Sequence, residues 1–128
     1  MTTEILVCVL CRPAELPRDH PRPGRALLEA IENIALRDEL AFAIRPVECM
    51  SGCHRHCTVA LQAPGKTTYF FGDLPADETS AEQVLACAAL HLASDDGFMT
   101  RKARPERLRE GILARLPAPL PTSPHVPR

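Results

Sequence analysis

The period of hydrophobic and polar positions changes several times along the chain, and each change marks an expected element. Residues 5–10 are an unbroken β-branched and aliphatic run, which is typical of a buried central strand. Residues 24–40 place apolar side chains at spacings of three and four opposite charged ones, so they predict an amphipathic helix. Residues 42–49 form a second strand-like run, in which Pro46 indicates an edge position or a bulge.

The following part of the chain predicts a hairpin and another helix. Residues 58–62 and 67–71 are strand-like, and the Pro-Gly pair at 64–65 between them is a type II turn signal. Residues 79–92 carry apolar side chains on one helical face, and Thr79-Ser80 offers an N-cap.

The C-terminal part is rich first in arginine and then in proline. Within residues 101–115, a short helix beginning near Pro105 is expected, and this Arg-rich segment is either a solvated helix face or a docking surface for an acidic partner. Residues 117–128 can neither pack a core nor continue a helix, so a disordered tail is expected. The prediction is one domain, residues 1–116, followed by this tail.

The order of these elements predicts the fold class. Strand, helix and strand, followed by a hairpin and a helix, is the plan of an α/β thioredoxin-like mixed sheet with a βαβ unit and, here, a C-terminal helical segment. The first βα connection and the loop after the second strand leave from the same end of such a sheet. Cysteines that lie far apart in the sequence, at 8–11 and 49–57, can therefore share one site.

Composition narrows the function classes. A net charge of -1 and an aromatic content of 4% without Trp argue against nucleic acid or anionic lipid as a partner. The chain has no apolar run long enough for a membrane span and no signal-peptide pattern at its start, so a cytoplasmic location is expected. Six cysteines in such a protein indicate metal ligation or redox chemistry, because cytosolic thiols are kept reduced.

Five of the cysteines form two groups, Cys8-x-x-Cys11 and Cys49-x3-Cys53-x3-Cys57. Four thiolates in two pairs suit a tetrahedral zinc site or an iron-sulfur cluster. Zinc ribbons and fingers favour Cys-x2-Cys or Cys-x4-Cys pairs with glycine beyond the second cysteine. A Cys-x3-Cys loop with Gly52 directly before its second cysteine therefore favours a cluster.

Basic residues surround these cysteines. Arg12, Arg55 and the two histidines of the loop would favour the reduced state of a cluster, as would backbone N-H groups around Gly52. The alternative is that they form a solvated loop surface. His54 or His56 is also a possible ligand in a mixed Cys/His site, although their spacing would place them on opposite sides of an extended loop.

Several motifs carry a resemblance to known families. Residues 47–53, followed by a strand and residues 65–69, resemble the thioredoxin-like 2Fe-2S ferredoxins and the related small subunit of respiratory complex I. Residues 4–116 are similar to a family of bacterial proteins described as predicted metal-binding, DUF1636. The motifs matched to that family are both cysteine groups, residues 60–66, Phe71-Gly-Asp73 and Arg104-Pro105.

The ferredoxin resemblance implies a 2Fe-2S cluster held by Cys8, Cys11, Cys49 and Cys53. It further implies one-electron transfer to a partner enzyme, no catalysis by the chain itself, and a possible homodimer. Two features depart from the ferredoxin pattern: the first cysteine pair is more closely spaced, and Cys57 stands where a proline is common. Cys57 is thus a possible additional or alternative ligand.

Two other functions stay open. A zinc or cobalt ion in place of the cluster would make this a metal-handling or metal-delivery protein, and the DUF1636 resemblance links that role to cobalamin or metal homeostasis. A thiol-disulfide redox protein is the third possibility. Pro13 and the proline-rich loop after Cys11 argue against it, because the redox motif normally opens a helix.

Overall fold

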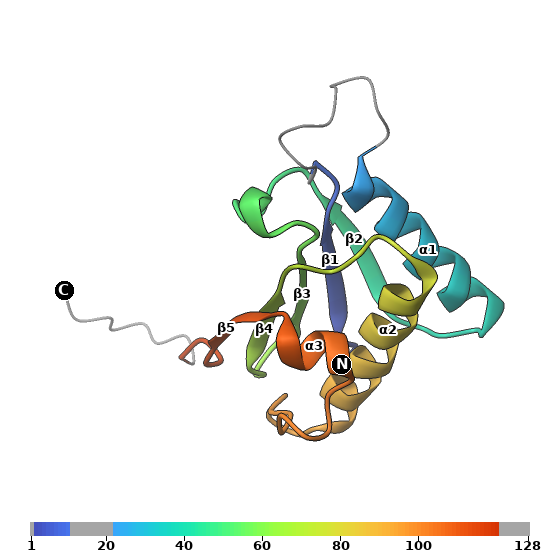
Figure 1. The fold of residues 1–128 in the computed structure, drawn as a ribbon. Coiled ribbons are helices and arrows are strands. Elements are labelled where there is room, and N and C mark those ends of the chain that lie inside the picture. The colour runs from blue at the N-terminus through green and yellow to red at the C-terminus, as the bar shows by residue number, and fades with distance from the viewer. Residues whose placement is uncertain (1, 11–21, 121–128) are drawn as a thin grey trace.

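A computed structural model describes residues 2–10 and 22–120 of the chain, which form a five-stranded mixed sheet with helices packed on it (Figure 1). The strand order is β2-β1-β3-β4-β5, with β1 and β2 parallel and every other neighbouring pair antiparallel. The strands are β1 (Glu4–Cys8), β2 (Ala43–Val47), β3 (Val59–Gln62), β4 (Thr68–Phe71) and β5 (Ile112–Leu116). The predicted βαβ unit, the hairpin and the edge position of Pro46 are confirmed.

The helices are α1 (Pro23–Arg37), α2 (Glu78–Ala93) and α3 (Glu106–Glu110), and a 3-10 turn η1 (Cys53–Arg55) follows β2. Proline at the first position of α1 suits a helix start, because its missing N-H would have no partner there. The N-cap of α2 is Asp77, whose carboxylate accepts a hydrogen bond from the Ser80 N-H at 2.8 Å. The predicted cap at Thr79-Ser80 is therefore wrong, since both residues lie inside the first turn.

The hydrophobic core lies between one face of the sheet and the two long helices. α1 and α2 lie side by side on that face (Figure 1). Alternate residues of the strands point into this core and meet the apolar stripes of the helices. The strand and helix residues of this core include Ile5, Val7, Val59, Leu61, Tyr69, Phe71, Leu27, Ile31 and Val84. Each such side chain, fully buried, stabilises the fold by about 1.5–3 kcal/mol, so this core sets the frame on which the loops are held.

The hairpin between β3 and β4 has the predicted turn. Gly65 has a φ of 73°, and the Lys66 N-H donates to the Ala63 carbonyl at 3.1 Å, as a type II turn requires. The Lys66 ammonium donates to the carbonyls of His91 and Leu92 at 2.9 and 2.8 Å. Lys66 therefore caps the C-terminus of α2 and fastens the hairpin to it.

The predicted helix in the Arg-rich segment is shorter than expected, and a strand follows it. α3 ends at Glu110 because Gly111 follows as its C-cap, and residues 112–116 form β5 along the edge of β4. The Gly72 N-H donates to the Gly111 carbonyl at 2.8 Å where the two strands meet. Pairing with the edge of β4 thus decides the conformation of residues 112–116, against their local preference for a helix.

Residues 117–120 are neither helix nor strand, and the rest of the predicted tail lies outside the described residues. None of the helices in the described ranges is long and apolar enough to cross a membrane.

Candidate metal centre

Cys8 and Cys49 are brought together by the parallel pairing of β1 and β2. Cys8 is the last residue of β1 and is paired with Val47, the last residue of β2. The Val9 N-H donates to the Val47 carbonyl at 2.9 Å, which continues the pairing one step beyond the strands. Cys49 follows two residues later, so both cysteines lie at the C-terminal ends of these strands, as the sequence predicts.

Cys53 completes a group of three thiols at this end of the sheet. It begins η1, and its side chain is hydrogen-bonded to that of Cys49. The pKa of the Cys53 thiol is raised, first by this bond and the negative charge of Cys49, then by desolvation and the charge of Cys8. Cys8, Cys49 and Cys53 are therefore neighbours. Cys11 and Arg12, also predicted for this site, lie outside the described residues.

The donor set suits a soft metal centre. Thiolates are the ligands of zinc sites and of iron-sulfur clusters, and three of the four predicted thiols lie at this end of the sheet, with Cys49 and Cys53 exposed and Cys8 buried. Within residues 2–10 and 22–120, however, no group of three or more Cys, His, Asp or Glu side chains is arranged to enclose a metal ion. The side chains fit the chemistry of a thiolate-bound centre.

The backbone between Cys49 and Cys53 turns sharply. Ser51 has a φ of 60°, and its N-H points at the Cys49 sulfur at 3.3 Å. A Cβ on Gly52 would come within 2.8 Å of the Thr58 methyl group and 3.2 Å of the Phe70 ring. Glycine at this position therefore lets the loop lie directly on the sheet. The expected N-H group aimed at sulfur is that of Ser51, next to Gly52.

The N-terminus of α1 packs against the same end of β1. A Cβ on Gly24 would collide with the backbone carbonyl oxygen of Cys8, so only glycine permits this approach. The Arg22 guanidinium donates to the Leu10 carbonyl at 2.9 Å just outside the helix. The first turn of a helix carries partial positive charge, so this end of β1 lies beside a positive helix end.

Cys57 has a different environment from the other cysteines of the loop. Its side chain is only 1% exposed and belongs to the hydrophobic core. The Cys57 N-H donates to the Leu74 carbonyl at 3.1 Å, and the Leu74 N-H donates to the Cys57 carbonyl at 3.3 Å. These contacts tie the end of the loop to the segment that follows β4.

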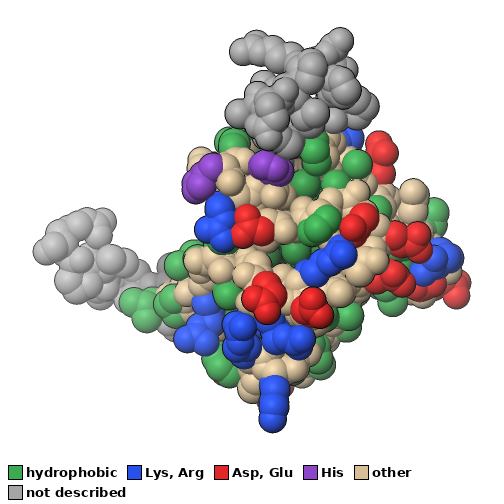
Figure 2. All heavy atoms as spheres, viewed as in Figure 1, with side chains coloured by type: hydrophobic (Ala, Val, Ile, Leu, Met, Phe, Trp, Pro, Cys, Tyr) green, Lys and Arg blue, Asp and Glu red, His purple; other side chains and the backbone are tan. Residues whose placement is uncertain are grey.

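The two histidines of the loop lie at the surface. Figure 2 shows histidine side chains at this end of the molecule. His54 is exposed, and His56 is half-buried. The His56 Nδ1-H donates to the Cys53 carbonyl at 3.0 Å, so this ring is directed at the backbone of η1.

Asp73 is a residue of this site that sequence reasoning missed. Its carboxylate accepts hydrogen bonds from Nε and Nη2 of Arg55, with Nε to Oδ1 at 2.9 Å. The backbone N-H of Asp73 donates to the Arg55 carbonyl at 2.6 Å. The pKa of Asp73 is lowered chiefly by the hydrogen bond from Arg55. Much of the positive charge expected of Arg55 near the cysteines is thus shared with Asp73. The only signal in the sequence was the Phe71-Gly-Asp73 motif.

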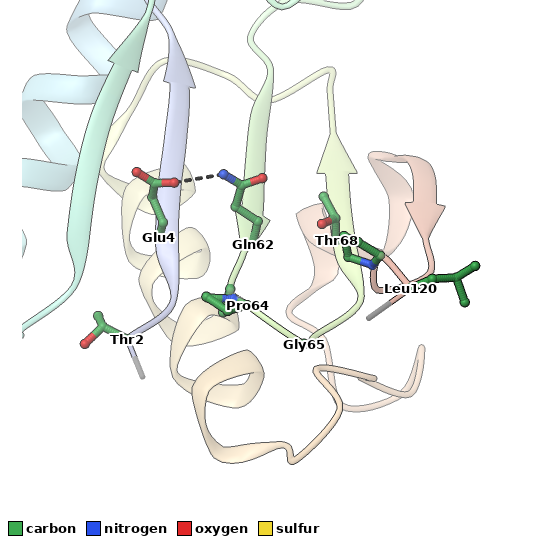
Figure 3. Close-up of a pocket in the computed structure, with 9 residues that line it drawn as sticks. Thr2, Glu4, Gln62, Pro64, Gly65, Thr68 and Leu120 are labelled. Atoms are coloured by element: carbon green, nitrogen blue, oxygen red, sulfur yellow. Dashed lines mark hydrogen bonds between the residues drawn. The ribbon is translucent and has the colours of Figure 1, made fainter. Parts of the chain in front are cut away.

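A separate cavity lies at the other end of the sheet. It has a volume of about 630 Å³ and is lined partly by Glu4, Gln62 and Thr68 (Figure 3). The Gln62 amide donates to the Glu4 carboxylate at 2.8 Å, and Arg45 pairs with the same carboxylate. Glu4 and Cys8 stand at opposite ends of β1, so this cavity is not part of the thiol group.

Comparisons with known proteins agree with this architecture. The solved structure of a thioredoxin-like [2Fe-2S] ferredoxin from Aquifex aeolicus is similar, with a TM-score of 0.56 and 19% identity over 89% of this chain and 92% of that chain. A 1.5 Å crystal structure of the wild-type thioredoxin-like [2Fe-2S] ferredoxin from the same organism gives 0.54 and 19%, over 88% and 97%. At this identity, the likeness shows the fold.

No curated protein matches the sequence. Residues 5–118, in contrast, match the family described as Protein of unknown function (DUF1636). The match spans both groups of cysteines and every strand and helix of the structure except the first residue of β1. The chain is therefore a member of the DUF1636 family with a thioredoxin-like ferredoxin fold.

Proposed function

We propose that this protein carries a 2Fe-2S cluster and transfers single electrons to a partner enzyme. One observation supports this more than any other: the end of β1, which carries Cys8, is paired with the end of the parallel strand β2, from which the loop with Cys49 and Cys53 leaves. Cys11 is the fourth proposed ligand. The chain itself would not be an enzyme.

The residues around the thiols have distinct roles in this proposal. A bound cluster supplies a one-electron carrier whose net negative charge grows on reduction. The Ser51 N-H, at 3.3 Å from the Cys49 sulfur, stabilises negative charge on that ligand. The first turn of α1, whose Gly24 packs against the Cys8 backbone carbonyl, brings the positive end of the helix to the same end of β1. Both features favour the reduced state.

The exposed part of the centre fits electron transfer. Cys49 and Cys53 are exposed, whereas Cys8 is buried. One edge of the centre would therefore be open to a partner, and the edge at Cys8 would be shielded from solvent. Cys57 has a structural role in this proposal, because its side chain is part of the hydrophobic core.

The test is chemical analysis of protein purified without oxygen. We expect a coloured protein with visible absorption of a 2Fe-2S cluster, iron and acid-labile sulfide in equal amounts, and a one-electron reduction. One zinc or cobalt ion per chain without sulfide would contradict the cluster and leave the metal-handling function. A metal-free protein whose cysteines cycle between dithiol and disulfide would leave the thiol-disulfide function.

Serine substitutions test the ligand assignment. Cys8→Ser, Cys49→Ser and Cys53→Ser should each lose most of the centre, measured as iron and sulfide per chain, because serine is a poor ligand for soft metals. Cys57→Ser should retain it. Cys87→Ser is the matched control, since Cys87 is buried in the core beside Met99, with its sulfur 3.6 Å away. Loss of the centre in Cys57→Ser with retention in Cys53→Ser would contradict the assignment.

A further inference from the structure

Arg104 is a buried arginine that forms no ion pair with a carboxylate among the residues that the structure describes. It is only 7% exposed, and its Nε is buried without a hydrogen-bond partner in the described part of the chain. Its guanidinium lies over the ring of Tyr69, 5.6 Å from the ring centre. The Tyr69 hydroxyl is held by the Met99 backbone, with the Met99 N-H donating to it at 2.8 Å. The Tyr69 ring below Arg104 is therefore held in place by the Met99 backbone.

The neighbouring arginines bring more positive charge to the same place. Arg109 donates to the Arg104 carbonyl at 2.5 Å, and Arg101 donates to the Arg109 carbonyl at 3.2 Å. We call Arg101, Lys102, Arg104, Arg109 and Arg115 the basic surface. None of the ion pairs formed within residues 2–10 and 22–120 involves any of these five.

Arg107, unlike the residues of the basic surface, forms an ion pair that stabilises the fold. This residue lies between Arg104 and Arg109 in the sequence, and its guanidinium binds the Asp77 carboxylate at 2.6 Å and the Ser80 hydroxyl at 2.8 Å. Arg107 thereby fastens α3 to the N-terminus of α2. The carboxylates of α3 itself, Glu106 and Glu110, are exposed and form no ion pair within the described residues.

A buried guanidinium without an anion is unfavourable, and contact with an aromatic face compensates only part of the cost. A partner carboxylate would compensate the charge of the guanidinium, whose planar fork matches the two carboxylate oxygens, while Nε itself stays buried. The surface also offers apolar contact: Phe98 is 45% exposed with Arg115 above its ring at 5.1 Å, and Leu116 is 56% exposed.

We propose that the basic surface binds an acidic, partly apolar segment of a partner protein, with a carboxylate of that segment paired to Arg104. Figure 2 shows lysine and arginine side chains gathered over the region of β5 and α3, away from the cysteine loop. Leu116 in this region is paired with Thr68, at the end of β4 far from η1. A partner seated there leaves the thiol centre uncovered. The proposal does not depend on which metal the thiols hold.

The test is binding of a short labelled peptide of glutamate and leucine to the full chain purified without oxygen, followed by fluorescence anisotropy. We expect saturable binding that weakens as salt is added. Arg104→Met should weaken it roughly tenfold or more, in line with the loss of a charged hydrogen-bonded pair. Arg25→Met is the control and should bind like the wild type, because Arg25 is an exposed arginine on α1.

Three results would overturn the proposal. The first is equal binding of a peptide with glutamine in place of glutamate. The second is wild-type affinity in Arg104→Met with an unchanged far-ultraviolet circular dichroism spectrum. The third is displacement of the peptide by millimolar inorganic phosphate, which would indicate a small-anion site. If Arg104→Met does not fold, the peptide affinity of the double variant Arg101→Gln with Arg109→Gln tests the proposal instead. Reduced affinity of that folded variant supports the basic surface, and wild-type affinity contradicts it.

Discussion

His91 is completely buried near the C-terminus of α2, and its ring joins three segments of the chain. Because a carbonyl only accepts, the Nε2-H donates to the Thr67 carbonyl at 2.7 Å. Nδ1 then accepts from the Thr3 hydroxyl at 2.8 Å. A neutral imidazole has one donor and one acceptor, so the neutral ring satisfies both contacts. Burial lowers the pKa of His91, and the nearby Lys66 charge acts in the same direction.

This residue predicts a specific pH dependence of stability. Since the pKa of His91 in the fold lies below its unfolded value of about 6.5, the unfolded chain binds the proton more readily. Its contribution to the free energy of unfolding is complete above about pH 6.5 and is lost as the pH falls, by at most about 1.4 kcal/mol per pH unit. Urea unfolding of the metal-free chain between about pH 7.5 and pH 5 measures this slope.

His91→Gln should lack this slope. Carboxylates with lowered pKa values, such as Asp38 and Asp73, lose their contribution below about pH 5, outside this range. The explanation fails if the glutamine variant shows the same decline between pH 6.5 and pH 5.

At the scale of elements, the connection between β4 and α2 holds η1 against the sheet. Three backbone hydrogen bonds join residues 55 and 57 to residues 73 and 74, and the Arg55–Asp73 ion pair reinforces them. The two side chains of that pair are 43% and 46% exposed. Such a pair contributes only about 0.2–1 kcal/mol to global stability, so its main effect should be local.

Asp73→Asn separates the local effect from the global one. We expect a change in the free energy of unfolding of no more than about 1 kcal/mol, together with faster loss of the centre to a chelator and faster amide exchange in residues 53–57. Asp38→Asn removes a comparable exposed ion pair on α1 with Arg37 and serves as the control. Equal rates of chelation in both variants would show that Asp73 does not hold the site.

At the scale of the whole molecule, the core does not depend on the exposed thiols of the cysteine loop. It lies between one face of the sheet and the helices α1 and α2 and includes Cys57, whereas Cys49 and Cys53 lie outside it. We therefore expect the metal-free chain to keep its circular dichroism spectrum and to unfold cooperatively, unlike a zinc finger. Loading the centre should raise Tm, because a ligand that binds only the folded state stabilises it.

The control for this prediction is Cys49→Ser, whose Tm should not respond to loading. A metal-free wild-type chain with the spectrum of an unfolded protein would contradict the prediction, because the core would then need the centre.

Local patterns predicted most of the elements, and the exceptions have a common cause. The turn at Pro64-Gly65 and the edge position of Pro46 follow from the chemistry of single residues, and both are present. The sequence predicts a helix within residues 101–115, because the spacing of Leu and Ile there is compatible with one. Residues 112–116 form β5 because the edge of β4 is open to them in space, and no local pattern records that edge.

For the candidate site, the sequence by itself determined the donors: cysteines in two groups, glycine at position 52, and a strand order that brings the two groups to one end of a sheet. Only the tertiary structure decided which side chains face one another. It places Cys8, Cys49 and Cys53 at one end of the sheet, turns Cys57 into the core, and joins Asp73 to Arg55. The physical reason is that side-chain direction in a loop depends on contacts with distant segments, here residues 70–74, which the spacing of cysteines does not contain.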